Sequence, residues 1–112
     1  MFGRQGEYAS QFNQKYSQEE ESQFKEVFSK ITLNFVEAKR AGLNPSDPNV
    51  QDLVRQHFEF VCRFWKPTKE AYKNLAMSYI LPTSYKDYYE DVEQGLGKYT
   101  YDAVVIWAES NL

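Results

Sequence analysis

The stretch VQDLVRQHFEFVCRFW, residues 50–65, most constrains what this chain can fold into. Mostly apolar side chains recur in this stretch at intervals of three and four residues, as they do on one face of an α-helix. Phe60 and Phe64 add a second apolar line, so the apolar surface is wider than the roughly 100° stripe of a surface helix. Such a helix is either wrapped by other helices or forms one wall of a cavity. The main stripe consists of Val50, Leu53, Val54, His57, Phe58, Val61, Cys62 and Trp65.

The segment before this stretch predicts a second long helix. Ser17 and Glu20 have the spacing of a capping box, and apolar residues then recur at helical intervals. The helix is expected to run from about Gln18 to Ala41, where Gly42 stands in a natural C′ position. Residues 1–16 carry little periodicity and predict at most a short or conditional helix.

Local signals divide the remainder into helices as well. Asp47 followed by Pro48 starts the helix of residues 50–65, and Pro67 ends it near Trp65. A fourth helix is capped by Thr68 and ended by Pro82, and a short fifth helix follows Thr83 or Ser84. Gly95 and Gly97 mark a turn before a last helix whose one side carries Leu96, Tyr99, Ala103, Ile106 and Trp107. With no alternating strand pattern of useful length, the predicted fold is all-α.

The bulk composition narrows the class of protein. A length of 112 residues suits one domain, and a net charge of −3 lacks the basic excess that nucleic-acid binding requires. One cysteine excludes an internal disulfide and fits a reducing cytoplasm, and one histidine with one cysteine cannot build the usual zinc sites. No apolar run approaches the roughly 18 residues of a membrane span.

Three interpretations of His57 follow from its place on the apolar face. It can be a core histidine satisfied by one hydrogen bond, a polar anchor inside an aromatic pocket, or an axial haem ligand. Nothing beyond the histidine itself supports the haem interpretation. Cys62 is expected on the buried side with no basic neighbour on its face to activate its thiol, which indicates an inert packing residue.

Aromatic residues make up 17% of the chain. A buried tyrosine hydroxyl needs a partner or water, so many tyrosines beside one apolar helix favour a groove of mixed polarity over a dry core. No arrangement of catalytic residues accompanies them, which indicates a binding domain and not an enzyme. The set comprises Phe60, Phe64, Trp65, Tyr72, Tyr79, Tyr85, Tyr88, Tyr89, Tyr99 and Tyr101.

Three segments carry a resemblance to a known family: SDPNVQDLVRQHFEFVCRFW, KEAYKNLAMSYI and YYEDVEQGLGKYTYDAVVIW. Their ordered features resemble the TipAS antibiotic-recognition domain, the ligand-binding half of TipA-type transcription activators of the MerR family. These features are Asp47-Pro48, His57, Phe64-Trp65, Tyr72 with Leu75, Tyr79 and Gly95-Leu96. Upstream, Lys15-Tyr16-Ser17 is similar to the family's entry into the long helix.

The resemblance implies a small globin-like helical fold of about five to six helices, without haem or another cofactor. It also implies a cleft for bulky, flat, multi-ring antibiotics, thiopeptides being the founding ligands. In the activators, ligand binding alters a linked winged-helix DNA-binding half, which is absent from this chain. Free-standing versions protect cells by sequestering drug.

Departures from the family pattern limit what carries over. Some members place a cysteine just after the central helix, where it attacks a dehydroamino acid of the ligand, but this chain has Thr68 there. Non-covalent binding is therefore expected. The family's Asp-x-Arg-Phe segment is also replaced, by Pro82, Ser84 and Tyr85 at its three defined positions.

These considerations predict that residues 1–112 form one cytoplasmic TipAS-like domain, with residues 1–16 as a candidate lid. It is expected to bind a hydrophobic multi-ring small molecule, and neither nucleic acid nor membrane. The oligomeric state stays open. A protein-interaction module that uses the tyrosines as a partner surface is the alternative. The predicted ligand-binding residues are His57, Phe60, Phe64, Trp65, Tyr72, Tyr79 and Tyr99.

Overall fold

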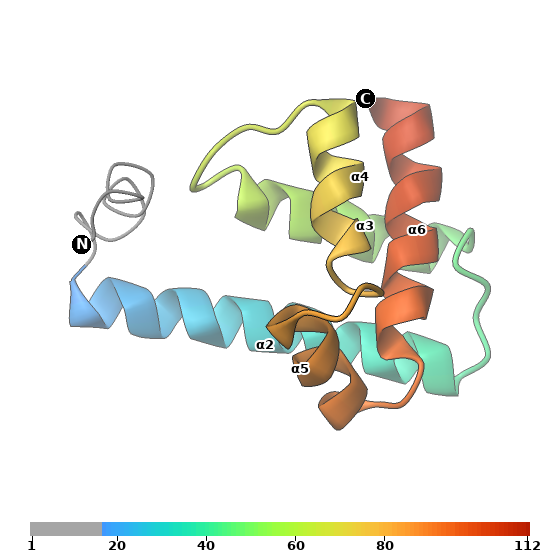
Figure 1. Ribbon diagram of the computed structural model, residues 1–112, viewed down its shortest axis with the longest axis horizontal. Coiled ribbons are helices and arrows are strands. Elements are labelled where there is room, and N and C mark those ends of the chain that lie inside the picture. The colour runs from blue at the N-terminus through green and yellow to red at the C-terminus, as the bar shows by residue number, and fades with distance from the viewer. Residues whose placement is uncertain (1–16) are drawn as a thin grey trace.

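The computed structural model describes residues 17–112, and all regular secondary structure in this range is helical (Figure 1). The all-α prediction is confirmed. The expected conditional helix and lid of residues 1–16 lie outside the described residues. The helices are α2 (Gln18–Arg40), α3 (Pro48–Val61), α4 (Lys69–Met77), α5 (Ser84–Val92) and α6 (Leu96–Asn111). None of these helices is long and apolar enough to cross a membrane.

Side-chain caps begin four of the five helices where the sequence predicts them. At α2, the Glu20 amide donates to the Ser17 hydroxyl and the Ser17 amide donates to the Glu20 carboxylate. Asp47, Thr68 and Thr83 accept a backbone N–H at the starts of α3, α4 and α5. Each cap satisfies an amide that the first helical turn leaves without a partner.

The end of α3 differs from its prediction. The helix ends at Val61, four residues before Trp65, and a tight turn follows. In that turn the Arg63 amide donates to the Phe60 carbonyl at 3.1 Å and the Phe64 amide donates to the Val61 carbonyl at 3.0 Å. Bonds over three residues are a common way to close a helix end. Phe64 and Trp65 therefore stand on the connection to α4 and not on the helix.

The helix that packs against every other described helix is α6 and not α3. α6 packs against α2, α3, α4 and α5, whereas α3 packs chiefly against α2 and α6. The residues predicted to share one side of this helix differ in burial, since Ala103 is buried, Trp107 is half-buried and Ile106 is exposed. The buried face of α6 consists of Leu96, Gly97, Thr100, Ala103, Val104 and Ala108.

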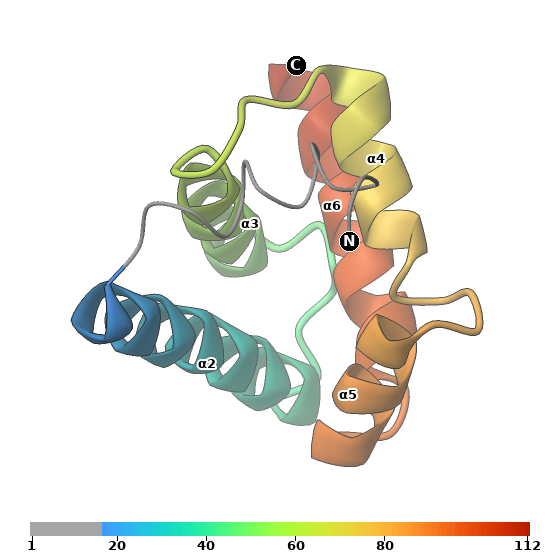
Figure 2. The same cartoon turned by 60° about the vertical axis from the view of Figure 1, so that its left-hand side comes forward.

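α4 and α6 form an antiparallel pair, and α2 and α3 extend from the same side of it (Figures 1 and 2). Lys73, early in α4, reaches Glu109, late in α6, at 2.5 Å. At the opposite end, the start of α6 lies against the backbone that follows α4. A β-carbon added at Gly97 would lie 2.2 Å from the Tyr79 carbonyl oxygen. Gly97 is thus a buried close-approach residue inside α6 and not part of the expected turn.

Replacing Gly97 with alanine is expected to destabilise the protein by about 1 to 3 kcal/mol, because the methyl group must displace the Tyr79 backbone. The adjacent substitution Lys98→Ala removes only an exposed pair with Asp102 and is expected to cost about 0.5 kcal/mol or less. Urea unfolding of both variants measures the difference. Equal free energies of unfolding would contradict the close approach.

Candidate functional site

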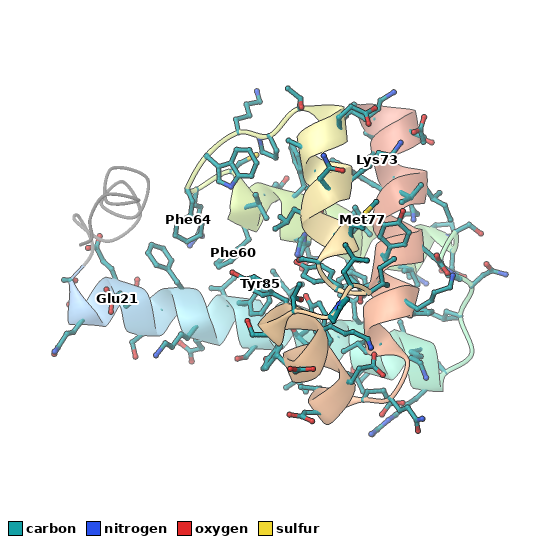
Figure 3. All side chains as sticks on the ribbon, viewed as in Figure 1. Glu21, Phe60, Phe64, Lys73, Met77 and Tyr85 are labelled. Carbon is teal, nitrogen blue, oxygen red and sulfur yellow. The ribbon has the colours of Figure 1, made fainter. Side chains whose placement is uncertain are left out.

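A groove of about 290 Å³ opens between α2, α3, the end of α4 and the start of α5. Figure 3 shows Phe60 and Phe64 directed from α3 and the following turn toward α2, with Tyr85 of α5 farther along α2. We call this cavity the aromatic groove. Its lining residues are Phe28, His57, Phe60, Val61, Phe64, Trp65, Leu75, Tyr79 and Tyr85.

Aromatic edges join the two long helices at this groove. Phe24 of α2 meets Phe64 with ring centroids 4.9 Å apart, and Phe28 meets Phe60 at 5.8 Å. Phe60 and Phe64 contact each other at 5.3 Å in a T-shaped arrangement. The two pairs that include Phe64 meet edge to face, whereas the Phe28 and Phe60 rings are tilted by 32° to each other. None of these four rings is fully buried.

His57 is the polar centre of the groove wall, and its side chain is buried. Its Nδ1 lies 2.7 Å from the Tyr72 hydroxyl and its Nε2 lies 3.0 Å from the Tyr79 hydroxyl. A neutral imidazole has one N–H and one bare nitrogen, so one hydroxyl accepts from the ring and the other donates to it. Both nitrogens are therefore paired, and the two tyrosines bind the middle of α3 to α4 and the turn after it.

Burial sets the protonation of this cluster. Desolvation lowers the pKa of His57 to about 4, so the imidazole is neutral at pH 7. Burial also raises the pKa of Tyr72 well above its ordinary range and that of Tyr79 to about 12. All three side chains are uncharged under physiological conditions, and the polar part of the groove wall carries no net charge.

Residues of α5 and α2 pack against this cluster. Tyr79 meets Tyr89 of α5 edge to face, with ring centroids 4.4 Å apart. Phe28 of α2 lies against the His57 ring, with centroids 6.4 Å apart. The Thr32 hydroxyl, one turn further along α2, donates to the Phe28 carbonyl at 2.9 Å.

The structure brings together five of the seven predicted residues. His57, Phe60, Phe64, Trp65 and Tyr79 line the groove. Tyr72 does not; it lies behind the groove wall, fully buried, as a partner of His57.

Tyr99 does not line the groove either. Its hydroxyl donates to the Leu43 carbonyl at 2.9 Å, which fastens α6 to the loop after α2. A helical stripe in the sequence does not show which neighbouring element Tyr99 faces. In the structure Tyr99 faces the loop after α2 and not the groove.

The sequence interpretation missed four lining residues. Phe28 stands on the regular apolar stripe of α2, and periodicity alone does not separate it from the core residues Ile31 and Phe35 on the same stripe. Tyr85 was noted among the aromatic residues but was left out of the predicted site. Val61 and Leu75 carry no signal that separates groove lining from core packing.

Cys62 differs from its prediction in one respect. It caps the C-terminus of α3 and is half-buried, not enclosed. It does not line the aromatic groove, although the next lining residues lie two and three positions further along.

Metal and haem ligation have little support in this geometry. Residues 17–112 contain no group of three or more His, Cys, Asp or Glu side chains placed to hold a metal ion. Both ring nitrogens of His57 are bonded to tyrosine hydroxyls, so axial ligation of haem would break one of these bonds.

The fold and the groove define a small all-helical domain with an aromatic-lined cavity beside a neutral polar cluster. The sequence profile of the TipAS antibiotic-recognition domain matches residues 2–107. Because this match covers nearly the whole chain, the protein belongs to the TipAS antibiotic-recognition domain family, whose members are ligand-recognition domains. No curated protein and no solved structure matches the chain.

The buried imidazole makes stability depend on pH. The folded-state pKa of His57, about 4, lies below the unfolded value of 6.5, so unfolding takes up a proton between these pH values. The contribution of His57 to the free energy of unfolding is fully present above pH 6.5. It is lost as the pH falls toward 4, and the total loss is on the order of 3 kcal/mol. Unfolding titrations of the wild type between pH 7 and 5 are expected to show the decline.

The variant His57→Gln is the control for this dependence, because glutamine offers one acceptor and one donor but does not titrate. It is expected to be less stable than the wild type at pH 7 and to lack the decline between pH 7 and 5. An equally steep decline in the variant would assign the effect to other groups.

Proposed function

We propose that this domain binds a bulky, flat, multi-ring small molecule non-covalently in the aromatic groove. The observation that carries the proposal is the convergence of rings from α2, α3 and α5 on one cavity of about 290 Å³. Ligand pockets of this kind are mostly apolar with a few placed polar groups. Membership of an antibiotic-recognition family supports an antibiotic as the ligand.

The exposed aromatic residues support the same site. Trp65, Tyr85 and Tyr88 are the aromatic side chains of residues 17–112 with the largest exposed fractions, 40%, 57% and 40%. Trp65 and Tyr85 line the aromatic groove, and Tyr88 stacks near Phe28 at its edge, with centroids 6.1 Å apart. Large exposed rings cost hydration free energy, and a planar ligand that covers them recovers it.

The polar cluster fits a ligand with few polar groups on its buried side. His57 and Tyr79 are already hydrogen-bonded to each other. They therefore present ring edges and carbon atoms to the groove, and few unused hydrogen-bond donors. A ligand ring laid against them leaves the network intact. Affinity then comes from burial of aromatic surface and from shape.

A thermal-shift panel of thiopeptides and other polycyclic antibiotics tests the proposal. At least one multi-ring compound is expected to raise the melting temperature, because a ligand that binds only the folded state stabilises it. Intact mass spectrometry of the complex is expected to show no adduct on Cys62. A panel without any stabilising compound, together with capture of one specific protein partner, would favour the interaction module.

Trp65 is expected to report binding directly. Since it is exposed and lines the groove, a ligand covering it should quench or blue-shift its emission, and Trp65→Ala should weaken binding by about tenfold. The background Trp107→Phe removes the other indole, which packs on Phe58 away from the groove. Unchanged affinity of Trp65→Ala would exclude Trp65 from the site.

We infer two biological roles that such binding serves, drug sensing when the domain is joined to a DNA-binding half and drug sequestration when it acts alone. The sequestration role predicts that expression in a susceptible bacterium raises the inhibitory concentration of the antibiotic that binds. Trp65→Ala, expressed at the same level, is expected to lose most of this protection. Equal protection by both proteins would contradict sequestration through the groove.

A further inference from the structure

A second cavity, of about 420 Å³, adjoins the aromatic groove between α2 and α5. It shares two wall residues, Phe28 and Tyr85, with the aromatic groove. We call it the outer lobe. Its lining residues are Lys25, Phe28, Ser29, Ser84, Tyr85 and Tyr88.

The two cavities meet at Phe28 and Tyr85, which belong to the lining of both. Phe28 meets Phe60 at 5.8 Å on the groove side and Tyr88 at 6.1 Å on the outer side. Tyr85 likewise contacts Tyr79 at 6.5 Å and lines both cavities. A ligand longer than the aromatic groove therefore extends along these two rings into the outer lobe.

The chemistry of the outer lobe differs from that of the groove. Two serine hydroxyls and one lysine stand beside three aromatic rings in its lining, and no carboxylate lines the cavity. Lys25 forms no ion pair with any residue between positions 17 and 112. One cation, two hydroxyls and a stacked pair of rings suit a planar group that carries a hydrogen-bond acceptor, above all a negatively charged one.

We infer that the outer lobe is a second subsite for the same ligand, and that it selects molecules whose multi-ring body carries an anionic or strongly accepting group on a short tether. The inference rests on the proposed function, because the rings of that ligand occupy the aromatic groove. The tether passes over Phe28 and Tyr85, and its acceptor group meets Lys25 with Ser29 or Ser84.

Pyrene derivatives of graded length and charge test the subsite. The probes are 1-pyrenemethanol, which has the ring body and a minimal substituent, 1-pyrenebutanoate, and the methyl ester of the latter. Lys25→Gln is expected to weaken binding of the butanoate by about two- to fivefold at low salt, as for other exposed charge pairs, and to leave the ester unchanged. Lys30→Gln is the matched control, an exposed lysine of α2 that lines neither cavity, and is expected to change neither affinity.

A blocking variant tests the same inference without charge. Ser29→Phe places a ring in the outer lobe from the surface of α2, and is expected to weaken both butanoyl probes while binding of 1-pyrenemethanol stays the same. Ser29→Ala is the control for loss of the hydroxyl alone. Circular dichroism and melting temperature establish that each variant is folded before its affinity is compared.

The outcomes separate the subsite from the groove. If Lys25→Gln and Lys30→Gln weaken butanoate binding equally, or if Ser29→Phe changes no affinity, the subsite is overturned while the groove stands. If the wild type binds none of the pyrenes, the inference is overturned as well, and the antibiotic panel alone then decides the groove. Selective loss of the charged probe in Lys25→Gln, with the short probe unaffected by Ser29→Phe, supports the subsite.

Discussion

The contact on which this structure depends most is the pairing of one imidazole with two tyrosine hydroxyls. His57 lies in the middle of α3, Tyr72 lies within α4, and Tyr79 follows its end. A buried polar group without a partner costs about 1 to 3 kcal/mol, so all three residues belong together. Their pairing holds α3 against the α4 segment and creates the neutral wall on which the aromatic groove is built.

The burial of α2 is uneven along its length. Its second half buries Ile31, Phe35 and Val36, and Arg40 at its end pairs with Glu93, the residue after α5, at 2.8 Å. The first half buries no side chain fully, and its rings Phe24 and Phe28 meet Phe64 and Phe60. The aromatic groove opens beside this half of the helix, where Phe28 is one of its lining residues.

Local sequence rules were sufficient for the helices and their starts. The capping box at Ser17, the Asp47-Pro48 start and the cap at Thr68 are contacts within a few residues, so their pattern is complete in the sequence. The early end of α3 was missed because three-residue bonds at a helix end leave no distinct pattern. Gly97 was assigned to a turn, whereas glycine is required there because the Tyr79 carbonyl oxygen leaves no room for a β-carbon. That carbonyl belongs to a residue 18 positions earlier, so local sequence patterns do not reveal the contact.

The candidate site was predictable only in part, because helical periodicity says which side chains share a face and not which element they meet. The run from His57 to Trp65 was identified from the width of its apolar surface. Tyr72 was assigned to the groove from residue type and the family resemblance, and Tyr99 from residue type. Phe28 comes from α2, which packs directly on α3, and Tyr85 comes from α5, which packs chiefly on α6. Their place in the site follows from packing between distant segments, which one sequence does not reveal.

The internal pairing of the polar cluster also determines the thermodynamic character of recognition. Donors and acceptors that already satisfy one another offer little enthalpy to a guest, and the remaining surface is chiefly aromatic carbon. Association in such a cavity is accompanied by a negative change in heat capacity in proportion to the apolar area covered. It also discriminates weakly among planar molecules of similar breadth, because no unpaired polar group penalises an imperfect match. The aromatic groove is thus suited to recognising a chemical class of compounds rather than one compound.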